Sequence, residues 1–254
     1  MQKFPVQRME EHVYSMKTIG YSVFENFLNP DDCKHLKNAL AGVIEAYHHD
    51  KNHIHDLLAK DILYARLLED ARLQQVVSAV LDDYWILYAF TTSSVPPNGE
   101  NYGGRIHVDC PRFVENYVFN VGIIWTLDDF TAENGGTRLL PSSHHCSTAP
   151  TQEYFEKNAV QLCCKAGSLI VFNARVFHCS TKNMTNQWRH SLTMNACRPF
   201  MKQRMDWVRI IPESIVNQLN PQAKRIIGYD TRLPASLEEF FVPEQERLYK
   251  AYQE

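Results

Sequence analysis

Four side chains in this sequence have the chemistry to bind a metal ion and an organic acid together: His107, Asp109, His178 and Arg189. Two histidines and one carboxylate can hold Fe(II) on one side and leave its other positions open. The planar guanidinium of arginine binds a carboxylate through two parallel hydrogen bonds, which lysine cannot reproduce. These residue types therefore predict an iron centre beside a bound dicarboxylate, as an oxygenase requires.

A His-x-Asp pair is too short a motif to identify a metal site by itself, and the chain contains a second pair, His48 and Asp50. That pair lies at the end of an expected helix, where residues two apart do not share a face. His107 and Asp109 fall in an expected strand, 103–109, where alternate residues project to the same side. We interpret His107 and Asp109 as the ligands and the earlier pair as a solvated polar patch.

The turn-rich residues 181–187 predict a hairpin between strands 176–180 and 188–197. In that pairing one face of the hairpin is polar and the other is more apolar. A polar stripe inside a β-sandwich is costly unless it lines a hydrated or ligand-filled cavity. The expected polar face consists of His178, Ser180, Arg189, Ser191, Thr193 and Asn195.

The middle of the chain has the pattern of an antiparallel sandwich or barrel, with short β-rich segments separated by turn residues and no long helix between them. The expected strands are 84–95, 103–109, 117–127, 137–141, 159–164, 168–173, 176–180 and 188–197.

Helices are expected on both sides of this β region. Asn29 and Pro30 suit the start of a helix over 31–48, and a second apolar stripe predicts a helix over 71–82. The polar residues 48–55 between them are expected to form an exposed connection. In the tail, Asn220, Pro221 and Gly228 bracket one short helix, and Ser236 with Glu239 forms a capping box for another.

The length of 254 residues predicts one domain over 1–254, with a helical part about 1–83, a β core about 84–200 and a helical tail about 206–254. A net charge of −3 argues against a nucleic-acid partner. The sequence shows neither a membrane-spanning run nor a signal peptide, and its seven cysteines lack a C-x-x-C pair. We expect a reduced, cytoplasmic protein that is a monomer or a homodimer.

The chain resembles the phytanoyl-CoA dioxygenase family of Fe(II)/2-oxoglutarate oxygenases over about residues 15–200. The resemblance rests on four motifs together, since any one alone is unspecific. They are Ile106-His107-Val108-Asp109, the segment Trp125–Arg138 with its Asn134-Gly135-Gly136, Pro141-Ser142-Ser143-His144, and His178-Cys179-Ser180 followed by Arg189. Ser142 replaces a glycine that is usual in the family.

The resemblance implies a double-stranded β-helix (jelly roll), with N-terminal helices packed on one sheet. It also implies Fe(II), 2-oxoglutarate and O2 as cofactor and cosubstrates, with iron held by His107, Asp109 and His178. Arg189 and Ser180 would bind the far carboxylate of 2-oxoglutarate, and Trp125, Thr137 and Asn120 would also contact this cosubstrate. Because halogenating relatives lack the carboxylate that Asp109 supplies, halogenation is disfavoured.

The leading interpretation is hydroxylation of a small molecule, with no residue assigned as general acid or base. Desaturation, epimerisation, ring rearrangement and oxidation of a protein side chain use the same centre and stay open. The alternatives outside this class are a cupin-like isomerase or hydrolase that does not use 2-oxoglutarate, and a non-catalytic jelly-roll binding protein. The residues expected to contact the substrate are Tyr102, Arg105, Arg112, Phe113, Trp188, Asn195 and Arg198.

Overall fold

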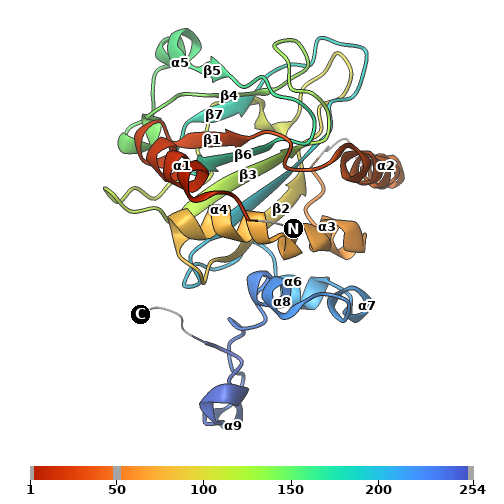
Figure 1. Ribbon diagram of the computed structural model, residues 1–254, viewed down its shortest axis with the longest axis vertical. Coiled ribbons are helices and arrows are strands. Elements are labelled where there is room, and N and C mark those ends of the chain that lie inside the picture. Colours follow the sequence, from red (N-terminus) through yellow and green to blue (C-terminus); the bar gives the residue numbers. More distant parts are fainter. Residues whose placement is uncertain (1–2, 48–52, 251–254) are drawn as a thin grey trace.

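The computed structural model describes residues 3–47 and 53–250 (Figure 1). The strands are β1 (Tyr21–Phe24), β2 (Ile86–Thr92), β3 (Asn120–Thr126), β4 (Thr137–Leu139), β5 (Val160–Gln161), β6 (Leu169–Asn173), β7 (His178–Ser180) and β8 (Ser191–Cys197). The α-helices are α1 (Val6–Thr18), α2 (Pro30–Ala46), α3 (Ile62–Arg66), α4 (Ala71–Leu81), α5 (Gln152–Asn158), α6 (Trp207–Ile210), α7 (Glu213–Val216), α8 (Pro221–Ile227) and α9 (Leu237–Phe240). The 3-10 helices are η1 (Leu57–Ala59), η2 (Leu67–Glu69), η3 (Tyr102–Gly104), η4 (Ser143–His145) and η5 (Glu244–Glu246).

The strands form two antiparallel sheets, a large one in the order β1-β6-β3-β8-β2 and a small one in the order β5-β4-β7. This confirms the expected mainly β fold with flanking helices, and it is consistent with a jelly roll. The expected strands are found at seven of the eight positions, with shorter bounds. The candidate metal ligands lie between the two sheets, where His178 belongs to the small sheet and contacts Phe172 of the large one.

The large sheet separates an apolar layer from the candidate site. Alternate residues of β3 and β8, such as Ile123 and Met194, pack in one hydrophobic cluster with Val76 and Val77 of α4. Figure 1 shows α1 and α4 lying across this sheet. The other residues of the same strands, such as Asn195, face the small sheet. The expectation that N-terminal helices cover one sheet is therefore confirmed.

The helix signals of the sequence correspond to real caps. The Asn29 side chain accepts a hydrogen bond from the backbone N of Asp32 at 2.8 Å, at the start of α2. Helix α4 begins after Asp70 and buries its apolar stripe. In the tail, the side chains of Asn220 and Ser236 cap α8 and α9. Helix α1, strand β1 and helix α5 were not expected from the sequence.

Residues 103–109 do not form the expected strand. Asn101 accepts a hydrogen bond from the backbone N of Gly103 at 3.0 Å and so starts the 3-10 turn η3. Beyond this turn, His107 alone makes a β-bridge, to His178.

The expected hairpin is also wrong, because the chain crosses from one sheet to the other between its two strands. Strand β7 pairs with β4 in the small sheet, and β8 pairs with β2 and β3 in the large sheet. The side chain of Asn183 holds the connection, donating to the carbonyl of Gln187 at 2.7 Å. The alternation within each strand is nevertheless as expected: Leu192, Met194 and Ala196 of β8 face the apolar layer.

The described end of the expected exposed connection, residues 53–55, is partly or fully buried. Residues 48–52, with the His48 and Asp50 pair, lie outside the described residues. Ile54 is only 2% exposed, and its backbone N and O are both hydrogen-bonded to Thr92 of β2. Ile54 thus lies against β2, at the edge of the large sheet. Within the described ranges, none of the helices has the length and apolar character needed to cross a membrane.

Candidate functional site: a His-Asp-His cluster beside a buried arginine

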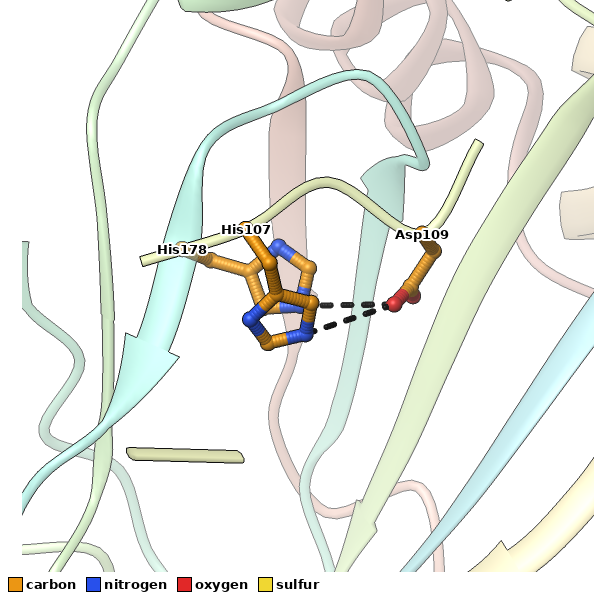
Figure 2. Close-up of side chains that lie close together, drawn as sticks. All are labelled: His107, Asp109 and His178. Atoms are coloured by element: carbon orange, nitrogen blue, oxygen red, sulfur yellow. Dashed lines mark ion pairs between the residues drawn. The ribbon is translucent and has the colours of Figure 1, made fainter. Parts of the chain in front are cut away.

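His107, Asp109 and His178 come together as the sequence predicts (Figure 2). One ligand atom from each lies within 4.8 Å of the others. The Nε2 atoms of His107 and His178 lie 3.6 and 3.7 Å from the same oxygen of Asp109, Oδ1. The side chains of His107 and Asp109 are 26% and 21% exposed, so a small molecule can approach the cluster from solvent.

The ring nitrogens of both histidines are arranged for metal binding. Nδ1 of His107 lies 2.7 Å from the carbonyl oxygen of Arg105, and Nδ1 of His178 lies 2.9 Å from that of Val176. A carbonyl only accepts hydrogen bonds, so in each neutral ring Nδ1 carries the proton and Nε2 has a free lone pair. A backbone partner of this kind is what fixes the tautomer and orientation of a metal-binding histidine.

Backbone hydrogen bonds place the cluster at the junction of a loop and the small sheet. His107 and His178 exchange two backbone hydrogen bonds of 3.0 and 2.9 Å. The backbone N of Asp109 donates to the carbonyl of Ala174 at 2.9 Å. The loop is thus fixed on both sides of Val108, and this holds His107 and Asp109 toward His178 although neither lies in a regular strand.

Gly122 in the large sheet leaves space for the Phe172 ring, and the Phe172 ring in turn contacts the His178 ring. A Cβ atom at Gly122 would lie 2.1 Å from the ring of Phe172. Without it, the Phe172 ring lies over β3 and meets the His178 ring edge-on, with centroids 4.8 Å apart. The pair confines His178 to one orientation.

The charges in the cluster favour an ionised carboxylate and a neutral inner histidine. Burial alone would raise the pKa of Asp109, but the nearby His178 and His107 and the hydrogen bond from Asn195 lower it to about 2. Burial lowers the pKa of His178. Burial also opposes protonation of His107, but its hydrogen bonds with Asp109 and the Arg105 carbonyl raise its pKa above the ordinary value.

Arg189 is almost completely buried, with 1% of its surface exposed, and it is held by neutral groups. Nη1 donates to the Ser93 carbonyl and the Ser191 hydroxyl, and Nη2 donates to the Gly135 carbonyl, each at 2.6 Å. Within the described residues Nε has no hydrogen-bond partner. Burial lowers the pKa of Arg189 to about 9, an effect that the charge of Asp128 partly offsets, so the guanidinium is still cationic at neutral pH.

Ser180 and Thr137 are paired neighbours across β7 and β4, and they lie on the same face of the small sheet as His178. The Ser180 hydroxyl donates to Oδ1 of Asn101 at 2.5 Å. The carbonyl of Gly135, next but one to Thr137, accepts from Arg189. The structure therefore brings Thr137 and Ser180 to the region between the cluster and Arg189.

These residues fit the groups that the sequence predicts. Two imidazole nitrogens and one carboxylate on one side of a common point suit Fe(II) with positions left open. A buried cationic Arg189 whose Nε–H has no partner suits a carboxylate ligand, because an unpaired buried donor is costly until such a partner arrives.

The other two residues expected at the cosubstrate are placed differently. Trp125 is fully buried on the face of β3 that packs against the helices, so the structure does not bring it to the cluster. Asn120 lies at the opposite end of β3 from Arg189, and its carbonyl accepts from the backbone N of Ala174. It is therefore near Asp109, and neither polar atom of its buried side chain has a partner in the described part of the chain.

The residues expected to contact the substrate divide into two groups. Asn195 lies in the site, where its Nδ2 donates to Oδ2 of Asp109 at 2.9 Å, and Tyr102 and Arg105 lie at its rim. The other four are further away or have structural partners. Arg112 is exposed, Phe113 lies under the guanidinium of Arg175, Trp188 stacks on His190, and Arg198 binds Asp82 and the Val118 carbonyl.

Comparison with known protein families matches residues 16–191 to phytanoyl-CoA dioxygenase (PhyH). The chain belongs to the phytanoyl-CoA dioxygenase family. The resemblance inferred from the motifs is therefore confirmed, together with Fe(II) and 2-oxoglutarate as the cofactors on which the family depends. Membership supports a dioxygenase-type role for this chain.

Individual proteins are also similar to this chain. The uncharacterized protein Rv1501 of Mycobacterium tuberculosis is 29% identical over 199 residues, which are 76% of this chain and 73% of that protein. The Fe(II)/2-oxoglutarate-dependent dioxygenase nvfF of Aspergillus novofumigatus is 26% identical over 195 residues, 71% of this chain and 62% of that protein. The non-heme alpha ketoglutarate dependent epimerase SnoN from nogalamycin biosynthesis shares the fold, with a TM-score of 0.66 at 15% identity over 77% of this chain and 85% of SnoN.

Sequence reasoning missed two residues of the site, Asn101 and His53. Asn101 binds Ser180 and follows Gly99-Glu100, where turn composition alone gave no reason to single it out. His53 lies in the stretch interpreted as an exposed connection, and its ring meets that of Tyr102 with centroids 5.4 Å apart. No local signal in the sequence links either residue to the cluster.

Proposed function

We propose that this protein is an Fe(II)- and 2-oxoglutarate-dependent dioxygenase that hydroxylates a small molecule and releases succinate and CO2. His107, Asp109 and His178 would hold the iron, and Arg189, with Ser180 and Thr137, would hold the far carboxylate of 2-oxoglutarate. Bound iron and 2-oxoglutarate supply the oxidising chemistry with O2. The observation that carries the proposal is the cluster of His107, Asp109 and His178, within 4.8 Å of one another.

The protein's own contribution is positioning. The Arg105 and Val176 carbonyls orient the two imidazoles, and Asn195 holds one oxygen of Asp109 so that the other faces both Nε2 atoms. Arg189 fixes the orientation of the dicarboxylate by a charge-assisted pair of hydrogen bonds. No residue is assigned as general acid or base. We propose that these parts act as one domain, in a reducing, cytoplasmic compartment.

The carboxylate of Asp109 bears on the type of reaction. A carboxylate in the third ligand position occupies the place that a halide would need, so hydroxylation is favoured over halogenation. Epimerisation remains the second candidate, because SnoN, which shares the fold, is an epimerase.

The test is an anaerobic titration of Fe(II) and then of 2-oxoglutarate into the protein. Visible absorbance is recorded after each addition. A weak charge-transfer band that needs both additions, and succinate formation once O2 is admitted, are the expected results. Neither signal would be seen from a cupin-like isomerase or hydrolase, or from a non-catalytic binding protein. Mass spectrometry of the substrate then separates hydroxylation, which adds one oxygen atom, from epimerisation, which adds none.

A further inference from the structure

Between η1 and α2, at the edge of the large sheet, His53 lies beside both halves of the candidate site. Its neighbour Ile54 is hydrogen-bonded to Thr92, and the next residue, Ser93, supplies the carbonyl that accepts from Arg189. On its other side the His53 ring meets Tyr102 edge-on, with centroids 5.4 Å apart and planes at 68°. His53 therefore connects the arginine end of the site with the loop that carries His107.

His53, Tyr102 and Arg105 together form a rim of the site, and Tyr102 and Arg105 are its part nearest to the metal ligands. The Arg105 guanidinium lies 5.3 Å from the Tyr102 ring centroid, and its Nη2 donates to the Tyr102 hydroxyl at 3.1 Å. The backbone of Arg105 binds the His107 imidazole, and Gly103, next to Tyr102, packs against the Ser180 side chain. Tyr102 thus contacts both His53 and Arg105, and the backbone of Arg105 contacts the metal ligand His107.

The rim has hydrogen-bonding capacity and positive charge that the described residues do not use. The Nε2 atom of His53 is buried without a hydrogen-bond partner among them. Tyr102 is 67% exposed, and no carboxylate of the described residues lies within ion-pair distance of Arg105. Glu100, the acidic residue nearest to η3, is exposed and approaches Gly104 rather than the guanidinium.

The electrostatic surroundings of His53 are those of a site for an anion. Burial, together with the charges of His55, Arg204, His107 and Arg189, lowers the pKa of His53 to about 4. His53 is therefore neutral at physiological pH, and the guanidinium groups of Arg204 and Arg189 supply positive charge around it. A neutral imidazole can donate one hydrogen bond, and a positive rim concentrates anionic ligands.

We propose that His53, Tyr102 and Arg105 form the substrate subsite, and that it binds a carboxylate group of the substrate. This proposal rests on the proposed function, in which 2-oxoglutarate occupies Arg189. An acid group of the substrate then needs a second cationic partner, which Arg105 supplies. Arg105 supplies the charge, His53 supplies a hydrogen bond from the buried side, and Tyr102 holds the guanidinium in place by cation–π contact. The substrate class is then a small carboxylic acid.

Benzoate and its uncharged counterpart benzamide are the probes, and their binding to the Fe(II)-loaded protein is measured anaerobically by ligand-observed NMR at saturating 2-oxoglutarate. Benzoate should bind more tightly than benzamide. Loss of one charge-assisted contact in His53→Ala or Arg105→Gln should weaken benzoate binding by about tenfold or more. Arg232→Gln is the matched control, because Arg232 is exposed in the tail and also lies 5.3 Å from a tyrosine ring centroid, that of Tyr229. It should bind benzoate as the unaltered protein does.

Several outcomes would overturn the subsite. They are equal binding of benzamide, no binding of benzoate, displacement of benzoate by excess 2-oxoglutarate, or equal weakening in Arg232→Gln. The charge-transfer band, recorded on the same samples, separates this failure from failure of the proposed function. A band without benzoate binding rejects the subsite alone, whereas absence of the band rejects the oxygenase on which it rests.

Discussion

Replacing Arg189 by lysine should separate 2-oxoglutarate binding from iron binding. Three of the five guanidinium N–H groups donate to Ser93, Ser191 and Gly135, which leaves the Nε–H and one Nη2–H for a ligand. Nε and Nη2 lie on the same edge of the guanidinium, where a carboxylate accepts two parallel hydrogen bonds. Lysine keeps the charge at this position but carries all its donors on one nitrogen, so it cannot supply that pair.

The magnitude follows from the number of bonds lost. A hydrogen bond to a charged group contributes roughly 1.5–3 kcal/mol, so losing one of the two weakens 2-oxoglutarate binding roughly 10- to 150-fold. The substitution also leaves at least one of the three buried acceptors unfilled. This costs roughly 1–3 kcal/mol in the free energy of unfolding, which the experiment must measure separately.

The assay titrates 2-oxoglutarate into Fe(II)-loaded protein without O2, follows the charge-transfer band, and determines iron affinity by chelator competition. Arg225→Lys is the matched control, because Arg225 is also buried and donates to a backbone carbonyl, that of Trp85, but lies in the tail helix α8. Iron affinity should be unchanged in both variants. Equal loss of iron and 2-oxoglutarate affinity in Arg189→Lys, or no loss of either, would refute the assignment of Arg189.

Three further substitutions test the site and the fold. Asn195→Ala removes the hydrogen bond to Asp109 and should weaken iron binding about 10- to 100-fold in chelator competition; unchanged affinity would contradict its positioning role. Gly122→Ala should lower stability by roughly 1–3 kcal/mol through overpacking, whereas Gly42→Ala, in open space on α2, should not lower it in the same thermal melts. Burial lowers the pKa of His12 to about 4, so only the unfolded chain gains its proton just below pH 6.5. From pH 7 to 5 the free energy of unfolding should fall by about 2 kcal/mol more in the unaltered protein than in His12→Gln, measured by urea denaturation; equal falls would exclude this linkage.

Local sequence patterns predicted the elements whose formation depends on local chemistry. Strand β6 is a continuous apolar run, and α2 and α4 carry both a capping residue and a buried stripe. Helix α1 was missed because it lacks these signals. It begins after Pro5, has no acidic residue in its first turn, and fully buries only His12 and Met16.

Strand pairing depends on residues far apart in the chain, and there the local patterns failed. Consecutive strands with a turn-rich connection usually pair, so a hairpin of β7 and β8 was the natural expectation. The chain instead places β7 beside β4 and β8 beside β3. His178 and Ser180 nevertheless share a face, because alternation along a strand does not depend on which strand lies beside it.

The sequence predicted that His107, Asp109 and His178 lie together, but the expected strand over 103–109 is not what brings them together. Residues two apart were expected to face one ion because they lie in a strand, but His107 and Asp109 lie in a loop. Their common direction comes from backbone bonds, from His107 to His178 and from Asp109 to Ala174. Ala174 is the second residue of a tight turn over 173–176, in which the backbone N of Val176 donates to the carbonyl of Asn173 at 2.8 Å. The two ligands of the His-x-Asp pair thus take their positions from the turn that precedes the third ligand. A change in that turn should therefore disturb all three ligands together, since the Val176 carbonyl at its end also orients the His178 ring.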